Sequence, residues 1–168
     1  MRFLADVRLG SLIIALALLS FSARAAAQEK TEAATRQYNT AVGLHNSEEY
    51  ELAAQEWIKF LNDFKKDPRI DRAWHYLGVC YLKQNNLPKA AETFETVVKS
   101  FPDFDLMGDT LLNLGLAQYN LAHGGKPEMY DKAAVTFNTL ATKYPEGKHV
   151  TDAIFFQGEC LYNRGKKK

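Results

Sequence analysis

The sequence is poor in cysteine and proline, and its charges almost cancel. Two cysteines are too few for a small protein held together by disulfides. A formal net charge of +1 supplies no basic face to neutralise phosphates, which argues against nucleic-acid binding. The 168 residues are 46% hydrophobic and 24% charged, as in an ordinary globular domain. Disorder and collagen-like order are therefore excluded.

The first 27 residues have the three-part order of a secretory signal peptide. A cationic start that includes Arg2 precedes residues 9–21, which carry no charge, and small residues ending at Ala27 follow. As a helix the uncharged run would be about 20 Å long, short of the roughly 30 Å hydrocarbon layer. We therefore expect a cleaved signal and no stable membrane span afterwards. Cleavage after Ala27 fits best, with Ala25 as the alternative.

Four sequence columns recur along the rest of the chain with one phase. They are Gly78, Gly115 and Gly158; Ala53, Ala90 and Ala133; Trp57, Phe94 and Phe137; and Pro102 and Pro145. The intervals are 37 residues and then 43 residues, and one insertion in the Gly/Pro-rich segment 124–129 accounts for the longer one. A fixed period of this length is typical of repeat architectures.

The spacing of apolar residues in each unit predicts two helices. Trp74, Leu77, Gly78 and Tyr81 recur at helical spacing, and a second apolar stripe follows the break at Asn85-Asn86. The small residues predict places where helix backbones meet closely, with aromatic rings filling the adjacent space. The expected helices cover about 31–46, 48–65, 70–84, 87–100, 106–122, 128–143 and 149–164.

The motif Trp74-x-x-Leu77-Gly78-x-x-Tyr81, followed by Ala90, Phe94 and Pro102, resembles the tetratricopeptide repeat. The resemblance implies an all-α fold, an α-solenoid of antiparallel helix pairs with about three and a half units. The domain after the signal peptide (residues 1–27) would be residues 28–168, with units at about 34–69, 70–105, 106–148 and a partial 149–168.

A further resemblance concerns a subgroup of these repeats. The segment Tyr144-Pro145-Glu146-Gly147, leading into Ala153 and Gly158-Glu159, is similar to repeats of bacterial envelope proteins, of the Tol–Pal-associated and outer-membrane assembly types. This similarity, together with the predicted signal peptide, implies export to a bacterial periplasm.

In the family, the first helices of successive units line a concave surface that binds a protein or peptide. The matching residues here are Tyr38, His45, Arg72, His75, Val79, Lys83, Leu112, Leu116, Tyr119, Asn120, Phe155, Glu159 and Tyr162. Apolar and aromatic groups that face no partner helix favour such a binding strip. The alternative is that some of them contact the next unit and belong to the core.

No motif indicates catalysis. The sequence contains no His-Glu-x-x-His, Cys-x-x-Cys or carboxylate-loop spacing, so no enzyme, cofactor or metal site is expected. Cys80 and Cys160 share a column two units apart, which places them roughly 20 Å from each other. A disulfide between them is therefore not expected, and each is predicted to be a small buried hydrophobe.

The last unit breaks off after its first helix. Ile154 and Leu161 then lack a partner helix, so we favour a fragment of a longer array over a terminal cap. If the chain stands alone, this exposed strip should promote self-association. The main functional hypothesis is an exported scaffold for protein–protein interaction. The alternatives are an envelope biogenesis factor and a regulatory repeat domain of a larger protein.

Overall fold

The computed structural model describes residue 24 and residues 27–165, and it divides the chain into two units, 1–37 and 38–168. In the first unit the structure shows helix over residues 27–37. Most of the predicted signal peptide lies outside the described residues, so that prediction is untested.

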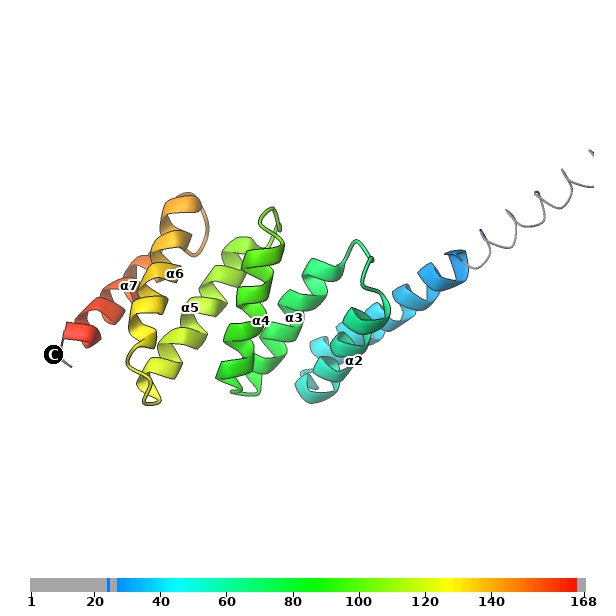
Figure 1. Cartoon of the computed structure of the whole chain (residues 1–168), viewed down its shortest axis with the longest axis horizontal. Helices are drawn as coiled ribbons and strands as arrows, with labels where there is room; N and C mark the ends of the chain where they lie inside the picture. Colours follow the sequence, from blue (N-terminus) through cyan, green and yellow to red (C-terminus); the bar gives the residue numbers. More distant parts are fainter. Residues whose placement is uncertain (1–23, 25–26, 166–168) are drawn as a thin grey trace, which may run out of the picture. The chain divides into compact units, whose positions relative to one another are not determined.

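In the described residues of the second unit, all regular secondary structure is α-helical, and turns join the helices. Helical residues 38–46 begin it, and six helices follow (Figure 1): α2 (Tyr50–Asp63), α3 (Ile70–Lys83), α4 (Leu87–Ser100), α5 (Met107–His123), α6 (Met129–Lys143) and α7 (Val150–Gly165). Each of these helices packs against the next one in sequence. The predicted all-α fold of paired helices is confirmed, with boundaries that differ by a few residues.

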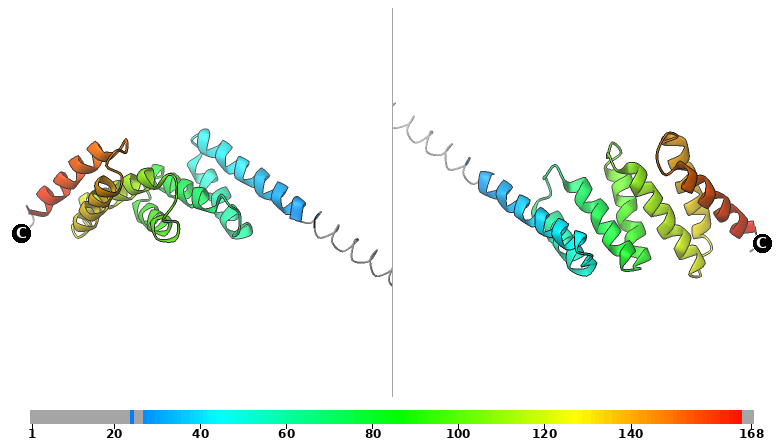
Figure 2. Two further views of the ribbon diagram at one scale, coloured as in Figure 1. Left: turned by 90° about the horizontal axis from the view of Figure 1, so that it is seen from above. Right: turned by 180° about the vertical axis from the view of Figure 1, so that it is seen from behind.

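The helices form two layers. Among α2–α7, the backbone of α3 approaches that of α5, and α5 approaches α7, to within 8 Å between Cα atoms, whereas α2 and α4, and α4 and α6, do not approach so closely. The even-numbered helices lie in front in Figure 1 and the odd-numbered helices in front in the rear view of Figure 2. Since the odd-numbered helices approach one another more closely, they form the inner layer of the stack.

Glycine at the helix crossings admits aromatic rings, as the repeat columns predict. A Cβ atom at Gly78 would lie 2.6 Å from Cε1 of Phe94, and one at Gly115 would lie 2.5 Å from Cε1 of Phe137. Both rings are fully buried. Carbon atoms this close would overlap within their van der Waals radii, so a side chain at either glycine would force the ring to shift.

Three of the turns between paired helices contain a residue with a positive φ angle. Glu48, Asn85 and Gly125 each have a positive φ, of 62°, 56° and 105°. After α3, the N–H of Asn86 donates to the carbonyl of Tyr81 at 2.8 Å and that of Asn85 to Leu82 at 3.0 Å. This is a Schellman motif, which satisfies carbonyls left open at a helix end.

The insertion in the third unit is absorbed by both the helix and the turn. Helix α5 has 17 residues where α3 has 14, so the extra chain partly lengthens the helix. Residues 124–128 then form the turn and are exposed, as predicted from their glycine and proline.

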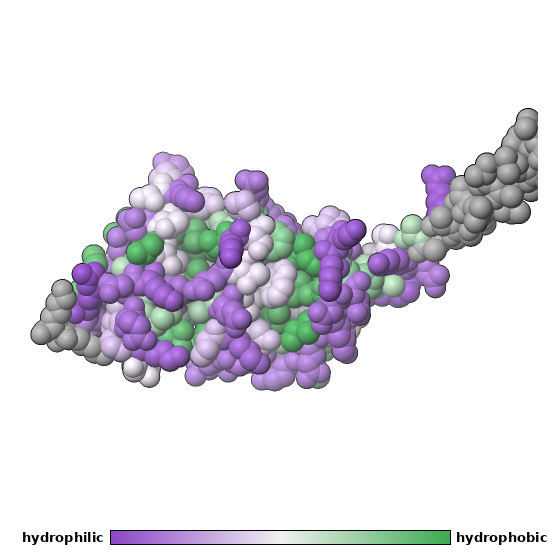
Figure 3. Space-filling view, viewed as in Figure 1, coloured by the Kyte–Doolittle hydropathy of each residue, from purple (hydrophilic) through white to green (hydrophobic). Residues whose placement is uncertain are grey.

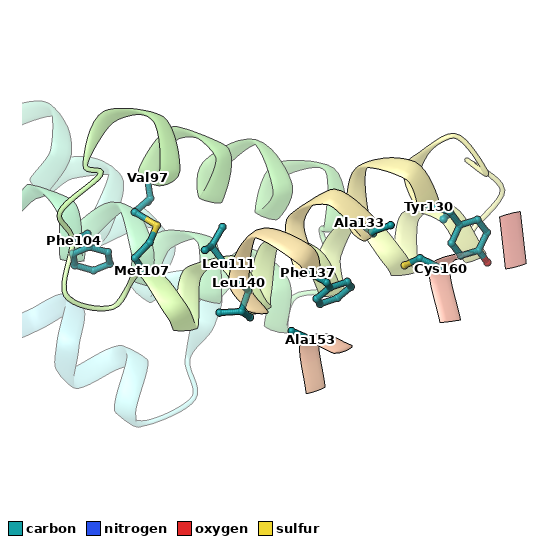
Figure 4. Close-up of a cluster of buried hydrophobic side chains, with 12 residues drawn as sticks. Val97, Phe104, Met107, Leu111, Tyr130, Ala133, Phe137, Leu140, Ala153 and Cys160 are labelled. Carbon is teal, nitrogen blue, oxygen red and sulfur yellow. The ribbon is translucent and has the colours of Figure 1, made fainter. Parts of the chain in front are cut away.

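A continuous core runs from α4 to α7. Val97 from α4, Leu111 from α5, Phe137 from α6 and Cys160 from α7 are all buried in one cluster (Figure 4). The inner side of α7 is therefore part of the stack, and only its other faces are left uncovered.

Candidate binding surface

The candidate residues lie on the odd-numbered helices and on residues 38–46. Lys83, Asn120, Phe155 and Tyr162 are exposed; Tyr38, His45, Arg72, Val79, Leu112, Leu116, Tyr119 and Glu159 are partly buried; and His75 is buried. We call the exposed and partly buried members the odd-helix surface. Phe155 and Tyr162, each 60% exposed, are its most accessible aromatic groups.

His75 belongs to the core, which corrects its place among the predicted surface residues. Its side chain is 4% exposed, and its Nδ1 lies 2.8 Å from Oγ1 of Thr110 on α5. That hydroxyl donates to the carbonyl of Leu106, so Nδ1 carries the proton and donates to Thr110. Burial lowers the pKa of His75 to about 4, so the imidazole is neutral and joins two units.

Tyr119 and its neighbours serve both the surface and the packing. Leu112, Leu116 and Tyr119 pack against the buried cluster of α4–α7. The Tyr119 ring meets Tyr130 at 5.9 Å and Phe156 at 5.4 Å, both edge to face. The part of this surface formed by α5 is thus supported by the core.

Charged groups connect successive units along the inner layer. Arg72 of α3 pairs with Asp105, which precedes α5. Asp109 of α5 receives Lys148 at 2.8 Å and His149 at 3.0 Å from the segment before α7. Partial burial opposes the charge on Asp109, but the hydrogen bonds from these two residues hold the pKa of its carboxyl below its usual value.

An aromatic pocket of about 250 Å³ opens beside residues 38–46. Its lining consists of Tyr38, Val42, His45, Asn46, Trp57 and Tyr76. The structure thus brings two predicted residues, Tyr38 and His45, together with Tyr76, which sequence reasoning missed because it lies outside every repeat column. Trp57 belongs to the aromatic column and is fully buried, as that column predicts.

The pocket is held together by ring contacts. Trp57 stacks on Tyr76 with ring centroids 5.7 Å apart, and Tyr38 meets Trp57 edge to face at 5.0 Å. Nε1 of Trp57 is buried and has no hydrogen-bond partner. An indole N–H in contact with aromatic rings can donate weakly to a ring face.

The contact between His45 and Cys80 provides no reactive group near neutral pH. Nδ1 of His45 lies 3.4 Å from Sγ of Cys80. Burial raises the pKa of Cys80 to about 12 and lowers the pKa of His45. Both groups are therefore neutral near pH 7, so this pair supplies no thiolate nucleophile. Burial likewise raises the pKa of Cys160 to about 11, and both cysteines are buried and free, as predicted for small hydrophobes.

A second hollow lies on the even-helix side, where the sequence analysis predicts no site. This groove of about 400 Å³ lies beside α2 and α3 and is lined by Ile58, Leu61, Asn62, Lys65, Ile70, Trp74, Leu77 and Phe101. Figure 3 shows apolar surface in the gaps between the even-numbered helices. No repeat column predicts this groove.

Two searches of the described residues are negative. Residues 24 and 27–165 contain no group of three or more His, Cys, Asp or Glu side chains placed to hold a metal ion. In the same residues, no helix combines the length and hydropathy that a membrane crossing requires.

Comparison with known families agrees with the repeat phase. Residues 71–104 match one profile of the tetratricopeptide repeat, and residues 109–147 match another. These two segments are similar to tetratricopeptide repeats. The two matched segments lie within the units expected at 70–105 and 106–148, and the units expected at 34–69 and 149–168 stay predictions.

Tetratricopeptide repeats are protein-interaction scaffolds, and repeat domains of this kind are typically non-catalytic. No curated protein matches the chain in sequence. The specific partner is therefore a matter for the structure and for experiment.

Proposed function

We propose that the chain is an exported scaffold that binds a protein or peptide through the odd-helix surface. The observation that carries this proposal is the close layer of odd-numbered helices, on which Phe155 and Tyr162 stand 60% exposed. Large aromatic groups offer much contact area for few rotatable bonds. Exposing such apolar groups to water is unfavourable in free energy, and aromatic groups are enriched at the centres of interfaces.

The mechanism is rigid presentation. The hydrogen bond from His75 to Thr110 holds α3 against α5, and the contacts of Asp109 with Lys148 and His149 hold α5 against the segment before α7. A surface fixed in this way loses little conformational entropy when a partner binds, so more of the contact free energy remains as affinity. No residue of the surface has to act as an acid, base or nucleophile.

Export is the second part of the proposal and rests on the sequence alone. The uncharged run 9–21 and the small residues ending at Ala27 support cleavage of residues 1–27 and a periplasmic location. A role in envelope biogenesis, of the Tol–Pal-associated or outer-membrane assembly type, is the finer alternative. A regulatory repeat domain of a larger protein is the other.

A displayed library of random peptides tests the binding surface. We expect the purified chain to enrich a defined set of peptides, and the double variant Phe155→Ser, Tyr162→Ser to lose that enrichment while retaining its helical circular dichroism. Val135→Ser is the matched control, because Val135 is 67% exposed on α6, outside the odd-helix surface. Equal enrichment by the double variant would overturn the binding proposal.

Mass spectrometry of the protein recovered from its native host tests export. We expect a mature N-terminus at Gln28, with recovery in the periplasmic fraction. An intact Met1 start on a protein that stays in the cytoplasm would contradict export, and it would leave the binding proposal to be judged by the library experiment.

A further inference from the structure

The groove beside α2 and α3 continues into a neighbouring hollow of about 290 Å³. The two share Ile58, Trp74 and Leu77, and the neighbouring hollow lies over α3 between residues of α2 and α4. Together they follow α3 from Ile70 to Tyr81, a length of about 17 Å at the rise of an α-helix. We call the two hollows together the α3 groove. It belongs to the apolar surface between the even-numbered helices in Figure 3.

The next unit bridges the equivalent place with polar side chains. Nε2 of Gln118 on α5 donates to Glu95 on α4 at 3.4 Å. Oγ1 of Thr136 on α6 donates to Oε1 of the same Gln118 at 2.8 Å. A chain of hydrogen bonds thus joins α4, α5 and α6 across the gap.

The α3 groove keeps the threonine of this chain but not its other two members. One unit earlier, the columns of the glutamate, the glutamine and the threonine hold Ile58, Tyr81 and Thr93. Ile58 is 38% exposed in the groove. Holding an apolar side chain in water is unfavourable, whereas a bound partner would cover it. The groove therefore differs from its repeat in the direction that favours binding.

The charged side chains of the groove are unevenly distributed. At the Tyr81 end, Nζ of Lys89 lies 5.3 Å from the centre of the Tyr81 ring, and Glu92 stands one turn along α4 and balances its charge. At the Ile70 end the charged lining residue is Lys65. Lys65 takes part in none of the ion pairs in the described part of the chain. This end therefore attracts a negative group of an occupant.

We propose that the α3 groove binds a segment of another protein that places bulky apolar side chains over Ile58 and Trp74 and an acidic residue beside Lys65. An apolar floor between polar rims is the anatomy of a protein interface. A groove of this length accommodates about five residues of an extended chain. The site lies on the even-helix side, so this proposal does not depend on the odd-helix surface.

Selection from a displayed library of random short peptides tests the proposal. The chain used carries Phe155→Ser and Tyr162→Ser, which removes the peptides expected at the odd-helix surface. We expect a set of peptides that is still enriched and that shares an acidic residue next to bulky apolar residues. A set without a shared acidic residue would contradict the assignment of Lys65.

Ile58→Glu with Tyr81→Gln is the decisive variant, because it gives the groove the residues of the next unit. Thr93 is already in place, so the chain of hydrogen bonds can form here too. We expect the selected peptides to bind about a hundred-fold more weakly, with helical circular dichroism retained. Ile58→Glu alone, at an exposed position, should weaken binding about ten-fold and serves as the test if the double variant does not fold. Leu52→Glu is the matched control, since Leu52 is 46% exposed on α2 and lines neither hollow.

Lys65→Glu reverses the charge at one end of the groove. We expect a selection on this variant to enrich basic residues where acidic residues were enriched before, with the apolar residues unchanged. An unaltered preference for acidic residues would show that Lys65 does not contact the partner.

Four other results would overturn the proposal. No set of peptides is enriched, or the selected peptides bind Ile58→Glu, Tyr81→Gln as tightly as the unaltered chain. Sedimentation shows a dimer that this double variant dissociates, which assigns the groove to a second copy. The protein recovered from its native host fails to bind the selected peptides, which assigns the groove to the protein's own chain. None of these results concerns Phe155 or Tyr162, so failure here is distinguishable from failure of the proposed function.

Discussion

Gly115→Ala adds one methyl group at a helix crossing that has no room for a Cβ atom. The new Cβ would lie 2.5, 2.6 and 2.8 Å from three ring atoms of Phe137, which is fully buried and so has no free space to move into. Overpacking of this kind costs up to about 3 kcal/mol. Replacing glycine in a helix interior returns about 1 kcal/mol. The net expectation is a loss of about 2 kcal/mol.

Gly158→Ala is the internal comparison, because its Cβ meets nothing within 4 Å. Only the helix term remains, so a gain of about 0.5–1 kcal/mol is expected. Thermal unfolding followed by circular dichroism should show Gly115→Ala lower by about 5 °C and Gly158→Ala higher by about 2 °C. Equal shifts for the two variants would refute the account of the repeat glycines as spaces for rings.

Three further expectations follow from single contacts, each measured by urea unfolding. Glu48→Gly should stabilise the chain by about 0.5–1 kcal/mol, since Glu48 has φ 62° and glycine adopts that conformation without strain; no gain would mean the turn is not strained. The free energy of unfolding should fall by roughly 3 kcal/mol between pH 6.5 and 4, because the unfolded state takes up a proton in this range whereas His75, with a pKa of about 4, does not. An equal fall in His75→Gln would contradict this. Arg72→Ala should change stability by less than about 0.5 kcal/mol, since both members of its ion pair are well exposed; a loss of 2 kcal/mol would show that the pair is structural.

The fold was predictable because its determinants are local. Glycine at 78 and 115 and rings at 94 and 137 recur at fixed spacing, so helix pairs and their crossings follow from the sequence. The residue that adopts the left-handed conformation in each turn was harder to predict from the sequence. The left-handed residue is Gly125 in one turn but Glu48 in another, and nothing in its residue type marks Glu48 for that conformation.

The exposure of the candidate surface residues was predictable only in part, because the position of a residue along a helix does not determine how deeply its side chain is buried. His75 occupies a column expected to face a partner, yet the next unit supplies Thr110 as its hydrogen-bond partner and covers it. Leu116 and Tyr119 likewise pack against the buried cluster of α4–α7. How closely neighbouring odd-numbered helices approach decides these cases, and that distance is a property of the stack rather than of one unit.

The packing of α4 has a mechanical consequence. Helix α4 packs against both α3 and α5, which belong to successive units. A change in curvature would therefore have to move α4 away from one of these two neighbours. The units are coupled in curvature as well as in position, which keeps the width of the groove lined by Trp74 and Leu77 constant.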